Sequence, residues 1–116
     1  MRRKTLILLA VLLIPSGLCA QSVVPDSVYR EVDTIIAQPG AQGLAGVLAN
    51  YQGYPWYPRL EDFALKKSRQ LVIMDNLEQA SAVSLAVIDA NLDNTDAVQL
   101  YQSIQRAQQR RNEDLR

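Results

Sequence analysis

The residues of this 116-residue chain that could carry chemistry are mainly carboxylates, and they have no evident catalytic partners. There is no histidine, which removes the commonest general base and the commonest zinc ligand. A nucleophile at Ser81 or Ser84 would need Lys67 as its base, and no spacing supports that pairing. We therefore predict packing serines and surface or capping acids, with no enzyme activity, no cofactor and no metal. These acids are Asp62, Asp75, Glu78, Asp89, Asp93 and Asp96.

A short polar run could be taken for a calcium loop. Asp89, Asn91, Asp93 and Asn94 offer oxygen ligands close together in the sequence. An EF-hand loop also needs a central glycine and a final glutamate, and this run has neither. Turn and helix-capping chemistry is the better interpretation, with Asp93 or Asn94 as the cap.

The first twenty residues have the layout of a secretory signal peptide. Residues 2–4 are basic, residues 6–14 form an unbroken apolar run, and residues 15–17 interrupt it. Nine apolar residues are too few to span a bilayer comfortably. We predict cleavage after Ala20 and a periplasmic or secreted protein of a double-membrane bacterium.

The lone cysteine gives a competing interpretation of the same segment. A bacterial lipoprotein signal ends in a cysteine, and Cys19 stands at the corresponding place. Leu18 directly precedes it, which departs from the small residue that such signals usually carry. Membrane contact is expected only if Cys19 is lipidated, and an uncleaved anchor is a third alternative.

The charge balance argues against a nucleic-acid partner. The chain has 12 basic and 12 acidic residues, and the segment before position 21 contains three of the basic ones. A mature chain would then carry 9 basic and 12 acidic residues, a net charge of −3, in 96 residues without cysteine. Such a domain lacks the basic field of a nucleic-acid binder and must be stabilised by its core or by a partner.

Apolar spacing predicts helices almost throughout. One is expected over residues 28–36, with Val28, Val32, Ile35 and Ile36 on one face, and a shorter one over 43–51, with Gly43 inside it. A strong helix is expected from Pro58 to Met74, another over 77–91, and a last one from about 95 with a polar end. The fold class is all-α, a small antiparallel helical bundle. After the signal at 1–20, we divide the chain into an N-terminal helical region at 21–53, a strap at 54–58 and a second helical region at 59–116.

The helix at 77–91 should be the central one. Between residues 79 and 88 it has no charged side chain, and most of its residues are small or apolar. A helix without a charged face is buried on more than one side.

The strap at 54–58 is the best candidate for a binding surface. Tyr54, Trp56 and Tyr57 lie among prolines that exclude regular helix. They could present a recognition patch or plug the open side of the bundle, and we favour internal packing for Trp56 and partial exposure for Tyr54. Lys67 falls within the apolar stripe of the next helix, which carries Leu60, Phe63, Ala64, Leu71 and Met74. This lysine could border a groove, or lay its methylenes on the core.

Residues 75–98 carry a pattern of small and large residues. The helix start reads Asp-Asn-Leu-Glu-Gln-Ala, the turn at 91–94 reads Asn-Leu-Asp-Asn, and Ala97 follows. This pattern resembles the second helix of a tetratricopeptide repeat, its turn and the next helix, although Leu92 replaces the usual proline. The resemblance covers residues 60–107 and implies a helix-turn-helix; a plain bundle with coincidental spacing is the alternative.

These features lead to one expectation about function. We expect a non-catalytic protein–protein interaction module, an adaptor or accessory subunit of the cell envelope that binds another envelope protein. The candidate partner-binding residues are Tyr54, Trp56, Tyr57 and Lys67. The alternative is an envelope-anchored lipoprotein with a structural role.

Overall fold

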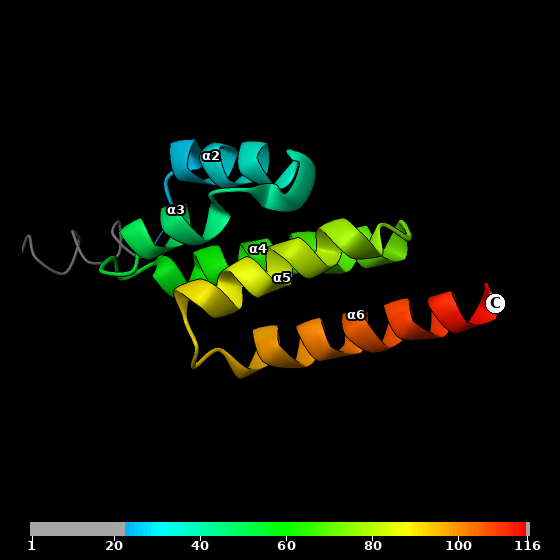
Figure 1. Ribbon diagram of the computed structural model, residues 1–116. Coiled ribbons are helices and arrows are strands. Elements are labelled where there is room, and N and C mark those ends of the chain that lie inside the picture. Colours follow the sequence, from blue (N-terminus) through cyan, green and yellow to red (C-terminus); the bar gives the residue numbers. More distant parts are fainter. Residues whose placement is uncertain (1–22, 116) are drawn as a thin grey trace, which may run out of the picture.

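The computed structural model describes residues 23–115, and these residues form helices and turns without any strand (Figure 1). The expected signal peptide and Cys19 lie outside the described residues. The predicted all-α bundle is confirmed. Its elements are α2 (Asp26–Ile36), the 3-10 helix η1 (Pro39–Ala41), α3 (Leu44–Asn50), α4 (Tyr57–Ile73), α5 (Leu77–Ala90) and α6 (Thr95–Asp114).

Helix α5 is the centre of the bundle, as its composition predicts. It packs against α4, α6, α3 and η1, and in Figure 1 it lies between α6 and the layer formed by α2 and α3. Ala80, Val83 and Val87 are completely buried. Small residues bring the helices close together, since the Ser68 hydroxyl of α4 donates a hydrogen bond to the Ala80 carbonyl of α5 at 2.8 Å.

The layer of α2 and α3 covers one side of α5. Val28, Val32 and Ile36 form the buried face of α2, in agreement with the predicted stripe. Gly43, expected inside the next helix, instead precedes α3 as its N-cap with φ +89°, a conformation that suits glycine. The helix therefore begins one residue later, at Leu44.

A glutamine ties this layer to the centre. The Gln79 side chain of α5 donates hydrogen bonds to the carbonyl oxygens of Ile36 and Gln38, both at 2.7 Å. Its own carbonyl oxygen accepts from the Gly40 amide at 2.9 Å. One side chain thus holds the connection that follows α2, a role that its sequence context did not indicate.

The helix starts follow capping rules. Pro58 lies in the first turn of α4, as expected. Asn94 is the N-cap of α6, because its side-chain oxygen accepts a hydrogen bond from the Ala97 amide at 3.0 Å. Asn76 has the same role for α5 through the Gln79 amide.

The predicted stripe of α4 is wrong at its C-terminal end. Leu60 and Ala64 are buried as expected, but Met74 is 67 % exposed. The buried face of α4 runs instead from Tyr57 to Ser68, and after Ile73 the chain turns toward α5. None of the described elements packs over Met74, so spacing alone overestimated the length of the buried stripe. Within residues 23–115, no helix combines the length and the hydropathy that a membrane crossing requires.

Candidate partner-binding surfaces

The aromatic residues between α3 and α4 form a compact corner. The Tyr54 and Trp56 rings stack with centroids 4.7 Å apart, and the Tyr51 ring lies 5.6 Å from Trp56. Trp56 is 4 % exposed and belongs to the main core, whereas Tyr54 is 50 % exposed. Internal packing of Trp56 and partial exposure of Tyr54 are therefore confirmed, and only Tyr54 of this pair can offer ring surface to a partner.

Tyr57 was predicted as a partner-binding residue, and the structure places it in the core instead. Its side chain is 6 % exposed. The reason is its position as the first residue of α4, where it shares a helical face with the buried Leu60 and Glu61. Because α4 begins at Tyr57, the strap ends two residues earlier than predicted.

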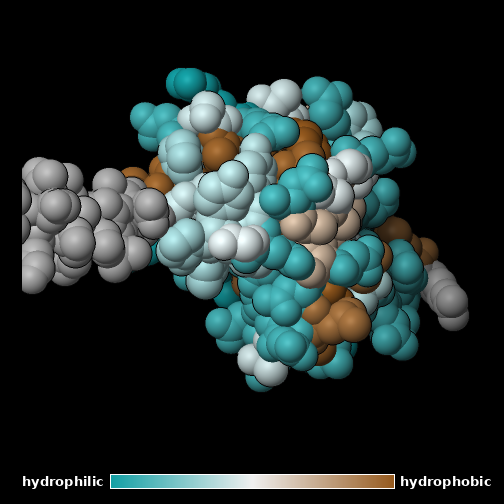
Figure 2. All heavy atoms as spheres, turned by 90° about the vertical axis from the view of Figure 1, so that its left-hand side faces the viewer, coloured by the Kyte–Doolittle hydropathy of each residue, from teal (hydrophilic) through white to brown (hydrophobic). Residues whose placement is uncertain are grey.

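Figure 2 looks onto this end of the molecule, where α3 leads into α4. Apolar residues appear there as separate patches among hydrophilic ones. No broad apolar face is visible in this view, which agrees with the burial of Trp56 and Tyr57.

A buried carboxylate fixes the start of α4 against the turn between α5 and α6. This carboxylate belongs to Glu61 of α4, which is 4 % exposed. Its Oε1 accepts hydrogen bonds from the side-chain amides of Asn91 at 3.1 Å and Asn94 at 2.8 Å. Two charge-assisted bonds compensate part of the desolvation of the carboxylate. Sequence reasoning missed this contact, and the only signal for it was the pair of asparagines in the turn.

The Tyr57 hydroxyl lies in the same buried region. Burial raises the pKa of this hydroxyl far above its usual value, and the neighbouring Glu61 carboxylate raises it further. A second tyrosine at this end has a simpler role: the Tyr51 hydroxyl donates to the Glu31 carboxylate of α2 at 2.6 Å, which raises its pKa. Both hydroxyls are protonated at neutral pH.

The second candidate surface is a groove between α2 and α4 with a volume of about 190 Å³. We call it the Lys67 groove. Lys67 is one of the residues that line the groove. Its ammonium group lies 5.4 Å from the centre of the Phe63 ring and 3.1 Å from the Asp33 carboxylate, with the side chain 31 % exposed. The groove is lined by the apolar side chains of Ile36, Ala37, Leu71 and Met74 and by the polar or charged ones of Asp33, Lys67 and Gln70.

The structure does not bring the two candidate surfaces together. Tyr54 precedes α4, whereas Lys67 lies ten residues after its first residue. At about 1.5 Å per residue, that separation is roughly 15 Å along the helix axis. The groove extends instead toward the C-terminal end of α4, where Met74 lines it. Met74 was not among the predicted binding residues.

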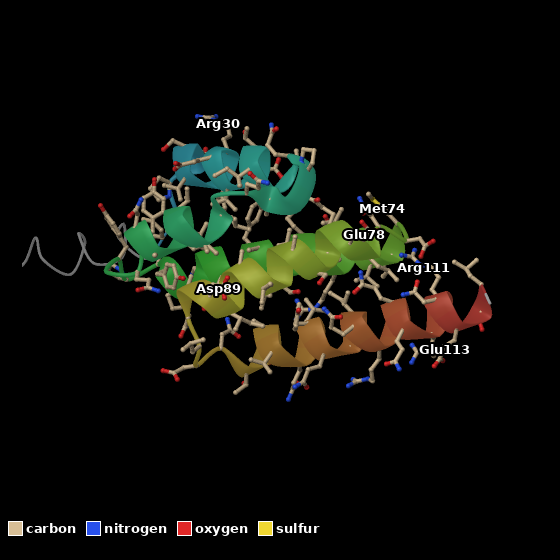
Figure 3. All side chains as sticks on the ribbon, in the orientation of Figure 1. Arg30, Met74, Glu78, Asp89, Arg111 and Glu113 are labelled. Carbon is tan, nitrogen blue, oxygen red and sulfur yellow. The ribbon has the colours of Figure 1, made fainter. Side chains whose placement is uncertain are left out.

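A polar depression of about 580 Å³ lies between the start of α5 and the end of α6. Glu78 and Arg111 line it, together with Gln105, Gln108 and Gln109. Arg111 also lies 3.5 Å from the Asp75 carboxylate, an exposed pair that contributes little stability. Figure 3 shows Met74, Glu78 and Arg111 gathered at this end, with Asp89 toward the other end of α5.

No group of three or more acids, histidines or cysteines in residues 23–115 is arranged to hold a metal ion. Comparison of the chain with protein families, with curated proteins and with solved structures finds no match.

Proposed function

We propose that this chain is a non-catalytic protein–protein interaction module of the bacterial cell envelope, which binds a segment of another envelope protein in the Lys67 groove. The observation that carries the proposal is the groove itself, which Met74 lines although its side chain is 67 % exposed. In this proposal the repeat-like pair of helices α5 and α6 supports the groove from behind and does not itself contact the partner.

The groove defines the chemistry of its occupant. Ile36, Leu71 and Met74 favour an apolar side chain, whose transfer from water is the main source of binding free energy. The Asp33 side chain is 55 % exposed and holds Lys67 through a surface ion pair. Such a pair is weak, so a carboxylate of the partner can replace Asp33 on Lys67 at little cost. We therefore propose a segment with an apolar anchor and a nearby acidic residue.

The cellular location rests on the N-terminal pattern. The basic residues, the apolar run and the interruption at 15–17 support export with cleavage after Ala20. Mass spectrometry of the protein recovered from the periplasm should then find Gln21 as its first residue. A lipid on Cys19 would instead establish the alternative of an envelope-anchored lipoprotein, and an N-terminus at Met1 would contradict export by cleavage.

The binding surface is tested by photocrosslinking in living cells. A photoreactive amino acid at position 74 should give a discrete crosslinked product with one envelope protein, and the same group at position 92 should not. Leu92 is a matched control because it is 77 % exposed and lies in the turn between α5 and α6, away from the groove.

A charge substitution gives the complementary test. Met74→Glu should abolish capture of that product, whereas Leu92→Glu should leave it unchanged, because both sites are exposed and tolerate the charge without unfolding. Equal capture by both variants would contradict the Lys67 groove as the binding surface. A crosslink from position 54 in place of position 74 would move the site to the aromatic corner.

A further inference from the structure

We propose that Gln79 of α5 is a positioning residue of the Lys67 groove, because it fixes the end of α2 that forms one wall of that groove. Gln79 does not itself line the groove. It sets how tightly the groove holds an apolar group that carries a carboxylate. This rests on the proposed function in one respect, the choice of the Lys67 groove as the binding surface.

The groove lies between the C-terminal ends of α2 and α4. The residues from α2 and its C-cap are Asp33, Ile36 and Ala37, and those from α4 and its C-cap are Lys67, Gln70, Leu71 and Met74. The exposed ion pair between Lys67 and Asp33 joins the two walls and is weak. The spacing of the walls therefore depends on what else holds the end of α2. The buried side chain of Ile36 is one support, and Gln79 is a second.

The side-chain amide of Gln79 matches the backbone at the end of α2. Its N–H groups donate to the carbonyl oxygens of Ile36 and Gln38, both at 2.7 Å, and its oxygen accepts from the Gly40 amide at 2.9 Å. We call these three hydrogen bonds the Gln79 clamp. Ile36 is the last residue of α2, where a helix leaves its carbonyl groups without intrahelical partners. A side-chain amide both donates and accepts, whereas a carboxylate only accepts and a thioether does neither well.

The loop after α2 needs this support. Gly40 and Ala41 have φ values of +73° and +47°, and Gly43 follows at +89°. The left-handed region is unfavourable for alanine, because its Cβ comes too close to a carbonyl oxygen. A loop with three left-handed residues does not continue the helix that would hold the end of α2. The Gln79 clamp fastens this end to the central helix α5 instead.

The test uses a small probe and a variant that removes the whole clamp. The probe, 4-methylpentanoate, combines a branched apolar end with a carboxylate, which is the chemistry proposed for the occupant. It is titrated into the isotope-labelled protein, purified as the cell exports it, and followed by NMR. The methyl signals of Ile36, Leu71 and Met74 should shift with saturation. Gln79→Met should weaken this binding about tenfold, because binding must then order the α2 wall.

Gln79→Glu separates the bonds of the clamp. Its carboxylate keeps an acceptor for the Gly40 amide but has no N–H group for Ile36 and Gln38. Hydrogen exchange of the Gly40 amide should therefore stay slow in Gln79→Glu and become about tenfold faster in Gln79→Met. Binding of the probe should weaken in both variants. A side chain that only filled space would not divide the two measurements in this way.

Two variants serve as controls. Gln105→Met removes another glutamine that bonds to α5, since the Gln105 side chain donates to the Ser81 hydroxyl at 3.3 Å and does not line the groove. Val83→Ala removes part of a completely buried side chain of α5, outside both the clamp and the groove. Both should bind the probe as the unchanged protein does, at a temperature well below their melting temperatures.

Three results would overturn the positioning role: no saturable binding to the unchanged protein, equal binding by Gln79→Met, or an equal loss in Val83→Ala. If Gln79→Met does not fold, unchanged probe binding by Gln79→Glu overturns it and weaker binding supports it. The photocrosslink from position 74 tests the proposed function separately. If that crosslink is absent while Gln79→Met still loses the probe, Gln79 positions the groove, and the groove is not the site of an envelope partner.

Discussion

At the two ends of α4, the exposure of the side chains is the opposite of what their residue types suggest. The N-terminal end has an aromatic and charged sequence, yet Trp56, Tyr57 and Glu61 are buried there. The C-terminal end is apolar, yet Ile73 and Met74 are exposed. Residue type predicts burial only when another element covers the residue, and the cover of α4 lies mainly at its start.

The cover at the N-terminal end comes from chain segments far apart in the sequence. The aromatic corner closes one side, and the turn between α5 and α6 supplies Asn91 and Asn94 to the Glu61 carboxylate. At the C-terminal end, α4 passes into a tight turn at Asp75, which has φ +62°, and α5 begins at Leu77. The first end is therefore expected to stabilise the fold, and the second is free to bind.

The largest effect should come from Trp56→Ala. The side chain belongs to the core, and its removal leaves a cavity, so we expect a loss of about 3–5 kcal/mol in the free energy of unfolding. Thermal and urea denaturation measure it. Tyr54→Ala is the matched control, because half of that ring is exposed and its loss should cost much less. An unchanged melting temperature for Trp56→Ala would contradict the packing role of this corner.

The next effect should come from the buried carboxylate. Glu61→Ala leaves the side-chain amides of Asn91 and Asn94 without their shared acceptor, which should cost about 1–3 kcal/mol. Glu61→Gln keeps one acceptor oxygen of the same shape and should lose less. If both variants have the melting temperature of the unchanged protein, the carboxylate does not hold the turn to α4.

Much of the fold could be predicted from the sequence because it depends on local signals. The spacing of Val28, Val32 and Ile36 predicted α2. Pro58 indicated the first turn of α4, and Asn94 was one of two residues predicted to cap α6. The lack of charge between residues 79 and 88 placed α5 at the centre.

The surfaces were harder to predict because they depend on contacts between distant residues. Nothing near Glu61 in the sequence indicates the two asparagines thirty residues later that allow its burial. Likewise, the exposure of Met74 follows from where α2 ends and α5 begins, and periodicity within α4 carries no information about that. The Lys67 groove was the one surface whose position the stripe suggested, although the stripe predicted burial of Met74, which is exposed and lines the groove.

A smaller effect concerns pH at the buried end. The Tyr57 hydroxyl has a raised pKa in the folded protein and a value near 10.0 without the fold. The folded state holds this proton more tightly, so its contribution to stability is complete below about pH 10 and is lost as the pH rises further. Tyr57→Phe should cost about 1 kcal/mol or less at neutral pH and should show a shallower loss of stability at alkaline pH. Parallel curves for the two proteins would contradict the burial of a neutral hydroxyl.

The smallest effect on stability should come from the exposed end. Met74→Ser removes an apolar side chain that no element covers, so the free energy of unfolding should change by no more than about 0.5 kcal/mol. Leu65→Ala, on the buried face of the same helix, should cost about 2–5 kcal/mol and serves as the control. If Met74→Ser keeps its melting temperature and loses the crosslinked partner, the apolar character of this end is explained by binding. If it unfolds the protein instead, Met74 packs against the fold, and the contrast between the two ends of α4 does not hold.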